Sequence, residues 1–294
     1  TARRAHQLHI IVVGGACHSD FDPELEHAMV LSVSLSQTLM HATVHSIGAF
    51  KAATDVLRAH ATHAEFVFCK AGSVCIVQGM NHTRTVLITC RLPIENVHGE
   101  RFSAGINLQS LHRLLRRCDD NAEAAVRLLP DGDQLEIAVT SGTVWKILLC
   151  DLDGEHFHIP TQGATPSCLV SHPATFVASL CAHAPVLTAS NSRWCNVGIN
   201  PTGVQITVVQ ENGGSEEGVH GSTRWDAAWH DITPPTSTEL TVAHEPMLSF
   251  FGRIPVRAVQ SVRVMVAAAP DMLRFFVRLV GGGELCLVLA ASVR

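Results

Sequence analysis

The amino-acid sequence predicts an α+β protein made of two similar domains of antiparallel sheet, each with two helices. Short apolar segments with the alternation of half-buried strands make up most of the chain, and four segments carry apolar residues at helical spacing instead. The order strand, helix, strands, helix, strands occurs twice. Corresponding segments lie roughly 130–140 residues apart, which indicates an internal duplication.

The first copy is expected to contain one helix near its start and one near its middle. A strand is predicted at residues 30–35, and a helix follows at 49–60, where Phe50, Ala53, Val56 and Leu57 recur at helical spacing. Strands are then predicted at 65–69, 74–78 and 85–92 and, after the second helix, at 124–129, 134–140 and 143–149.

The second helix of this copy, expected at residues 107–118, has an apolar face and a basic face. Asn107 is a good N-cap, because its side chain can accept from the free amides of the first turn. At about 100° per residue, one face collects Leu108, Leu111, Leu114, Leu115 and Cys118, and the other collects His112, Arg113, Arg116 and Arg117. The segment contains no acidic residue, although the whole chain has a formal charge of −5. Segregated positive charge of this kind is typical of a phosphate-binding surface, whereas an ordinary solvated helix face is the alternative.

The second copy repeats this plan. Helices are predicted at 173–183, with Pro173 in the first turn, and at 245–254. Strands are predicted at 167–171, 186–190, 197–200, 204–210, 223–229, 239–243, 261–267, 273–279 and 284–290, and residues 211–221 are expected to form a mobile loop. The unguarded strands 123–129 and 194–198 are the expected edges for assembly.

The expected domain boundaries follow from composition. Residues 1–27 form an N-terminal extension, whose apolar run at 9–13 is too short for a secretory signal and is interpreted as a strand. Residues 28–150 form the first domain, and 166–294 form the second. The acidic, proline-containing segment 151–165 connects them.

Composition excludes several classes of protein. Hydrophobic residues make up 47% of the 294-residue chain and charged residues 16%, which excludes disorder. No apolar run approaches the roughly 20 residues of a membrane span, so no membrane partner is expected. Ten cysteines occur singly, with no Cys-x-x-Cys pair, which favours free thiols in a reducing compartment, cytosol or nucleus.

These features together resemble a known family. The segment 104–111, the segment 148–153 with Ile159 and Pro160, and the strand at 167–170 leading to Pro173 and Phe176 are similar to sliding DNA clamps of the proliferating-cell nuclear antigen type. The similarity extends over about residues 29–294. It implies the DNA-clamp fold: two domains with inner helices, and a ring-forming assembly around duplex DNA.

Several features depart from the replicative, homotrimeric clamp. The chain has an N-terminal extension, an expanded loop at 212–214, a triglycine final hairpin at 281–283 and a second domain poor in inner-face lysine. The segments 142–146 and 272–288 look more like a Rad-type subunit of the heterotrimeric DNA-damage checkpoint clamp. The resemblance therefore favours a checkpoint clamp in the nucleus over a processivity clamp for DNA polymerase.

The resemblance also implies site residues and partners. The expected DNA-binding residues are Arg113, Arg116, Arg117, His112, Lys51, Arg58, Arg253 and Arg257, and the expected partner-binding residues in the connector are Leu152, Phe157, Ile159 and Pro160. The expected partners are sequence-independent duplex DNA, two other clamp subunits, an ATP-dependent clamp loader, and repair and checkpoint proteins. No catalytic residue, metal or cofactor is implied.

A metal-dependent DNA exonuclease is the alternative from another class. Its acidic cluster would be Asp20, Asp22 and Glu24, with Asp151 and Asp153 in reserve. Two-metal nucleases need carboxylates held rigidly around paired ions. A segment interrupted by Pro23 is poorly suited to that task, so the sequence favours a protein that performs no catalysis.

Overall fold

A computed structural model describes residues 40–99, 101–152, 167–189, 193–200, 203–210, 218–229, 238–268 and 271–291. These residues form four α-helices and two antiparallel sheets, which confirms the α+β class. The strand predicted at 30–35, the extension at 1–27 and most of the connector lie outside the described residues.

The first half contains two helices and nine strands. The helices are α1 (Ile47–Leu57) and α2 (Leu108–Leu115). The strands are β1 (Met40–Val44), β2 (His63–Cys69), β3 (Val74–Met80), β4 (Val86–Pro93), β5 (Glu95–His98), β6 (Phe102–Asn107), β7 (Ala124–Leu128), β8 (Gln134–Val139) and β9 (Val144–Leu148).

The second half repeats this order with one strand fewer among its described residues. Its helices are α3 (Pro173–Ala189) and α4 (His244–Phe251), with a short 3-10 turn, η1 (Val256–Ala258), after α4. Its strands are β10 (Ser167–Val170), β11 (Trp194–Asn200), β12 (Gly203–Gln210), β13 (Gly218–Trp229), β14 (Thr238–Ala243), β15 (Val259–Ala268), β16 (Asp271–Leu279) and β17 (Glu284–Ala290).

The strand pairings of the two halves correspond. In the first half the strands run β6-β2-β3-β4 in one sheet and β5-β1-β7-β8-β9 in another. In the second half β14-β11-β12-β13 continues directly into β10-β15-β16-β17, because the end of β13 turns to pair with β10. Thus β13 takes the places of both β4 and β5, and β17 takes the place of β9.

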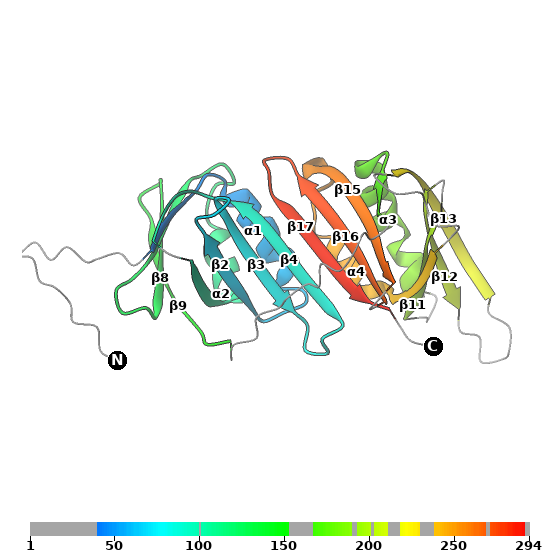
Figure 1. Ribbon diagram of the computed structural model, residues 1–294, viewed down its shortest axis with the longest axis horizontal. Coiled ribbons are helices and arrows are strands. Elements are labelled where there is room, and N and C mark those ends of the chain that lie inside the picture. The colour runs from blue at the N-terminus through cyan, green and yellow to red at the C-terminus, as the bar shows by residue number, and fades with distance from the viewer. Residues whose placement is uncertain are drawn as a thin grey trace, which may run out of the picture.

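A pairing between β4 and β17 joins the halves into a single 12-stranded sheet. Six consecutive residue pairs hold this junction, from Glu284 opposite Arg91 to Leu289 opposite Val86. Figure 1 shows the result as a sheet that runs across the molecule from β2 to β15, with α1 and α4 behind it. The backbone of the first half is therefore hydrogen-bonded to that of the second, even without the connector.

The helices of both halves lie on the same face of this sheet. Directly opposed residues in a sheet point to the same side, and one such row contains Gly79, Ile88, Leu287 and Phe275. A Cβ atom on Gly79 would lie 2.9 Å from Leu57 of α1, so α1 covers one end of the row. At the other end, the Phe275 ring contacts Phe251 of α4 edge-to-face at 5.2 Å between centroids.

Most predicted elements form, and three local predictions are wrong. The strand predicted at 186–190 is part of α3 as far as Ala189, and Pro185 lies inside this helix without ending it. The loop predicted at 211–221 ends earlier, since Gly218 already pairs with Gln210 in the β12–β13 ladder. The helix predicted at 107–118 stops at Leu115. Beyond its C-cap, the backbone hydrogen bonds join residues three apart instead of four.

The predicted assembly edges are also wrong. β7 pairs with β1 on one side and β8 on the other, and β11 lies between β14 and β12. A strand with both neighbours in place has no backbone groups left for another chain. Within the described residues, β9 has one neighbour, β8, and residues 218–226 of β13 have one neighbour, β12.

The edge strand β6 is covered by the chain that leaves β9. The Cys150 amide donates to the Gly105 carbonyl at 2.9 Å. A Cβ atom on Gly105 would lie 2.1 Å from the Cys150 carbonyl oxygen and 2.7 Å from Leu152. Only glycine allows this approach, and the following connector therefore starts against β6.

Phe251 is expected to be a main stabiliser of the second half. It is fully buried and contacts Phe176, Phe250 and Phe275 edge-to-face. Phe251→Ala should lower the free energy of unfolding by about 3–5 kcal/mol, measured by urea denaturation. Val280→Ala, at a side chain that is 67% exposed, is the control and should change it by no more than about 0.5 kcal/mol. Equal effects of the two changes would contradict the observed packing.

Candidate nucleic-acid interface

The helix α2 is fixed by its apolar face, as the sequence predicts. Leu108, Leu111 and Leu115 are buried, and Leu114 and Cys118 pack against the core at its margin. The Asn107 side chain accepts from the Ser110 amide at 2.9 Å, so the predicted N-cap is confirmed. The opposite face of α2 consequently points away from the core.

Three arginines occupy that opposite side. Arg113 lies in the last turn of α2, Arg116 is the C-cap, and Arg117 follows in the turn beyond the helix. All three side chains are exposed. Among the described residues, none of the ion pairs present involves these arginines. They form a compact patch of uncompensated positive charge.

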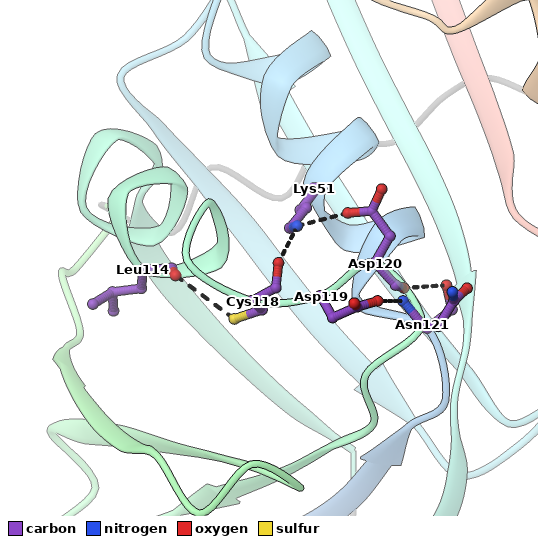
Figure 2. Close-up of polar contacts among 7 residues, drawn as sticks. Lys51, Leu114, Cys118, Asp119, Asp120 and Asn121 are labelled. Atoms are coloured by element: carbon purple, nitrogen blue, oxygen red, sulfur yellow. Dashed lines mark hydrogen bonds and ion pairs between the residues drawn. The ribbon is translucent and has the colours of Figure 1, made fainter.

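Two acids that follow α2 bind partners other than these arginines. Asp120 accepts from the Lys51 ammonium at 2.6 Å, and the Asp119 carboxylate accepts from the backbone amide of Asn121 at 2.8 Å (Figure 2). In sequence these acids lie three and four positions after Arg116, which would suit ion pairs on a longer helix. Because α2 ends at Leu115, the chain turns and the acids serve other partners.

The ammonium group of Lys51 is hydrogen-bonded within the protein and is not free. Its Nζ atom donates to the Cys118 carbonyl at 2.5 Å as well as to Asp120, and its side chain is only 21% exposed. The same segment also accepts a hydrogen bond from the first turn of α1, because the Gly48 amide donates to the Asp120 carbonyl at 2.9 Å. Lys51 therefore ties α1 to the end of α2, and it contributes no free charge to the patch.

Arg58 and His112 share one carboxylate. Arg58 Nε lies 3.0 Å from Asp55 Oδ1, and His112 Nδ1 lies 2.9 Å from the same oxygen. This cluster bridges α1 and α2 and compensates part of the expected positive charge. The acid lies on a neighbouring helix, so inspection of residues 107–118 alone could not find it.

The remaining expected DNA-binding residues lie in the second half. Arg253 follows α4 and Arg257 lies in η1, and both are exposed. The helix α3 carries no lysine, arginine or carboxylate anywhere in its sequence. In the second half, the exposed expected cations therefore lie after α4 and in η1, and none lies on α3.

The expected partner-binding residues are only partly described. Leu152 is half-buried and lies against Gly105, at the start of the connector. Phe157, Ile159 and Pro160 lie outside the described residues, as do the acids Asp20, Asp22, Glu24 and Asp153 of the nuclease alternative. Their predicted roles stay predictions.

Metal ligands, thiols and helix hydrophobicity in the described part of the chain also bear on its function. No group of three or more His, Cys, Asp or Glu side chains there could hold a metal ion. Burial raises the pKa of the Cys168 thiol to about 11 and that of Cys195 to about 12, so these thiols stay protonated at neutral pH. None of the described helices has the length and apolar character needed to cross a membrane.

Comparison with known proteins does not assign this chain to a family. A scan against known protein families finds no match for this chain, and a search of curated proteins finds no relative.

Replacement of Lys51 should lower the folding stability, whereas replacement of Arg113 should not. Lys51→Met leaves the Cys118 carbonyl and Asp120 without their donor, and it should cost about 1–3 kcal/mol of folding stability. Arg113→Met, on the exposed side of α2, should change stability by no more than about 0.5 kcal/mol. Thermal and urea unfolding of both variants measure this difference, and a larger destabilisation by Arg113→Met would reverse the assignment.

Proposed function

We propose that this chain is a non-catalytic subunit of a sliding DNA clamp, which encircles duplex DNA in a ring and recruits other proteins to it. The observation that carries the proposal is the edge-to-edge joint between two equivalent halves, with the helices of both on one face. The exposed arginine patch on that face supplies the interaction with phosphates.

Repetition of the internal joint supports a ring. Inside the chain, β4 of the first half pairs with β17 of the second. Their counterparts by topology are β13 in the second half and β9 in the first, and both have unpaired backbone along one side among the described residues. Pairing β9 of one chain with β13 of the next repeats the same joint between molecules. A head-to-tail contact of this kind generates a ring when its rotation closes on itself, and the proposal requires that closure.

The surface of β9 is suited to being covered. Val144 is 53% exposed and Leu148 is 71% exposed, and both alternate with the buried side of the strand. Exposed apolar side chains on a free edge favour association with another strand. Lys146 lies between them and limits uncontrolled edge-to-edge pairing.

The charge distribution supports a heterotrimeric, checkpoint-type ring more than a homotrimeric one. Lys51 and Arg58 have carboxylate partners, and α3 carries no lysine or arginine. Three identical copies would repeat this weak second half three times, whereas different subunits can add charge of their own. We propose nuclear localisation, loading by an ATP-dependent clamp loader, and recruitment of repair and checkpoint proteins as parts of the same hypothesis.

The arginine patch is tested by a salt titration of DNA binding. Replacing Arg113, Arg116 and Arg117 by Ala in the assembled ring should weaken binding to every duplex sequence, because phosphate contacts carry no sequence information. The slope of log affinity against log salt should flatten by up to about 0.9 for each phosphate interaction that the substitutions remove.

A matched variant removes the same charge from the opposite face. Arg91, Arg263 and Arg278 are exposed and adjoin Cys90, Val262 and Val277, which face the helices, so the three arginines point the other way. Their replacement by Ala should leave the salt slope unchanged. Equal slopes for wild type and both triple variants would contradict the proposed DNA contact.

The proposed ring contact is tested by a proline on the free edge. The Leu149 amide donates to the Asp133 carbonyl of the β8–β9 hairpin, so by alternation the Lys146 amide points away from β8. Lys146→Pro should preserve the monomer fold and prevent assembly, and Lys146→Ala should preserve both. Sedimentation of the chain alone, and co-expressed with candidate clamp subunits, measures the size. Undiminished assembly of a folded Lys146→Pro variant would exclude β9 as the contact.

The same measurement distinguishes the two clamp types. A wild-type trimer of this chain alone would favour the replicative type. A monomer that forms a one-to-one-to-one complex on co-expression would favour the checkpoint type.

A further inference from the structure

An open hollow of about 560 Å³ lies beside the N-terminal end of α2. It is lined by the end of α1, the start of β2, the turn after β3 and the first turn of α2. The residues that line it with polar nitrogen atoms are Arg58, His60, His63, His82 and Gln109. None of its lining residues is acidic.

The chemistry of this lining fits an anion. Arg58 uses its Nε atom for Asp55, and its terminal amino groups have no ion pair within the described part of the chain. His63 and His82 are exposed, and the buried Nε2 atom of His60 has no hydrogen-bond partner among the described residues. Guanidinium and imidazole groups are donors that match phosphate oxygens.

The charges around His60 are consistent with an anion-binding site. Burial is the main cause that lowers the pKa of His60. The positive charge of Arg253 lowers it further, and Glu245 acts in the opposite direction. An anion in the hollow would counter both lowering effects, because a nearby negative charge favours the protonated imidazole. Around the hollow, Asp55 pairs with both Arg58 and His112, and His63 Nε2 lies 3.2 Å from Asn107 Nδ2.

The hollow continues the arginine patch. Gln109, which lines it, and Arg113 are four residues apart on α2, and so lie on one helix face. Arg116 follows three residues later on the same side. Gln109, Arg113 and Arg116 thus form a row of polar and basic side chains that runs from the hollow to the end of α2.

We propose that this hollow is a phosphate-binding site, which takes a phosphate of the DNA held by the arginine patch. The DNA source of this phosphate rests on the proposed function, whereas the site itself does not. A phosphate binds a protonated imidazole more strongly than a neutral one, so we expect binding at this site to strengthen as the pH falls. The contact of the chain with DNA then has two parts, a constant arginine part and a pH-dependent histidine part.

The site is tested first without DNA. Histidine ring signals of the full chain are followed by NMR during titration with sodium phosphate, and with sodium chloride at equal ionic strength, at pH 6.5. Phosphate should shift the signals of His60, His63 and His82 saturably, and it should leave the exposed His98 and His172 unchanged. Arg58→Gln should abolish the saturable shifts. Equal shifts with both salts would overturn the proposal.

The source of the phosphate is tested by DNA affinity at pH 6.0 and pH 7.5. One or two added phosphate contacts should make wild-type binding roughly three- to tenfold tighter at pH 6.0. The double variant His63→Gln and His82→Gln should lose this ratio and keep its affinity at pH 7.5, because both side chains are exposed. The matched control, His98→Gln with His172→Gln, should keep the ratio.

The outcomes separate this proposal from the proposed function. The triple arginine variant should bind more weakly at both pH values and keep the pH ratio. A saturable phosphate shift without any pH effect on DNA binding would assign the hollow to a free phosphorylated ligand and would overturn the DNA source alone. If the double histidine variant kept the full pH ratio, the hollow would have no part in DNA binding, even where the arginine variant loses affinity.

Discussion

The pairing of β4 with β17 is the constraint on which the arrangement of this molecule depends. It converts two separate halves into one sheet and fixes their register through six residue pairs. Because opposed residues share a face, this register places α1 and α4 on the same side. In this register Ile88 and Leu287 lie opposite each other and are both buried, so the core continues across the junction.

Two kinds of positive charge coexist on the helix side, and their surroundings distinguish them. Lys51 and Arg58 have carboxylate partners and connect structural elements, Lys51 to the segment after α2 and Arg58 to the cluster around Asp55. Arg113, Arg116 and Arg117 are exposed on the side of α2 that faces away from the core. Lys51 uses its single nitrogen for both of its partners, whereas Arg58 pairs through Nε and keeps its terminal amino groups for another ligand.

Local patterns predicted well wherever the cause was local. The leucine spacing and the Asn107 cap define α2, and alternation defines β3, β8 and β12. The predictions failed where distant residues intervene. The start of α1 has no side-chain cap, and carbonyls of Asp120 and Ala122 accept from its first amides, more than 70 residues away in the chain.

The sequence by itself determined the α+β class, the repeated order of elements and the basic face of α2, because periodicity and charge segregation are properties of neighbouring residues. Only the tertiary structure decided which strands are edges, which cations are paired, and that His60, His63 and His82 meet in one hollow. The reason is physical: strand pairing and ion pairing join residues that are far apart along the chain. Their partners are fixed by the register of the sheet and the docking of the helices, and no local pattern records either.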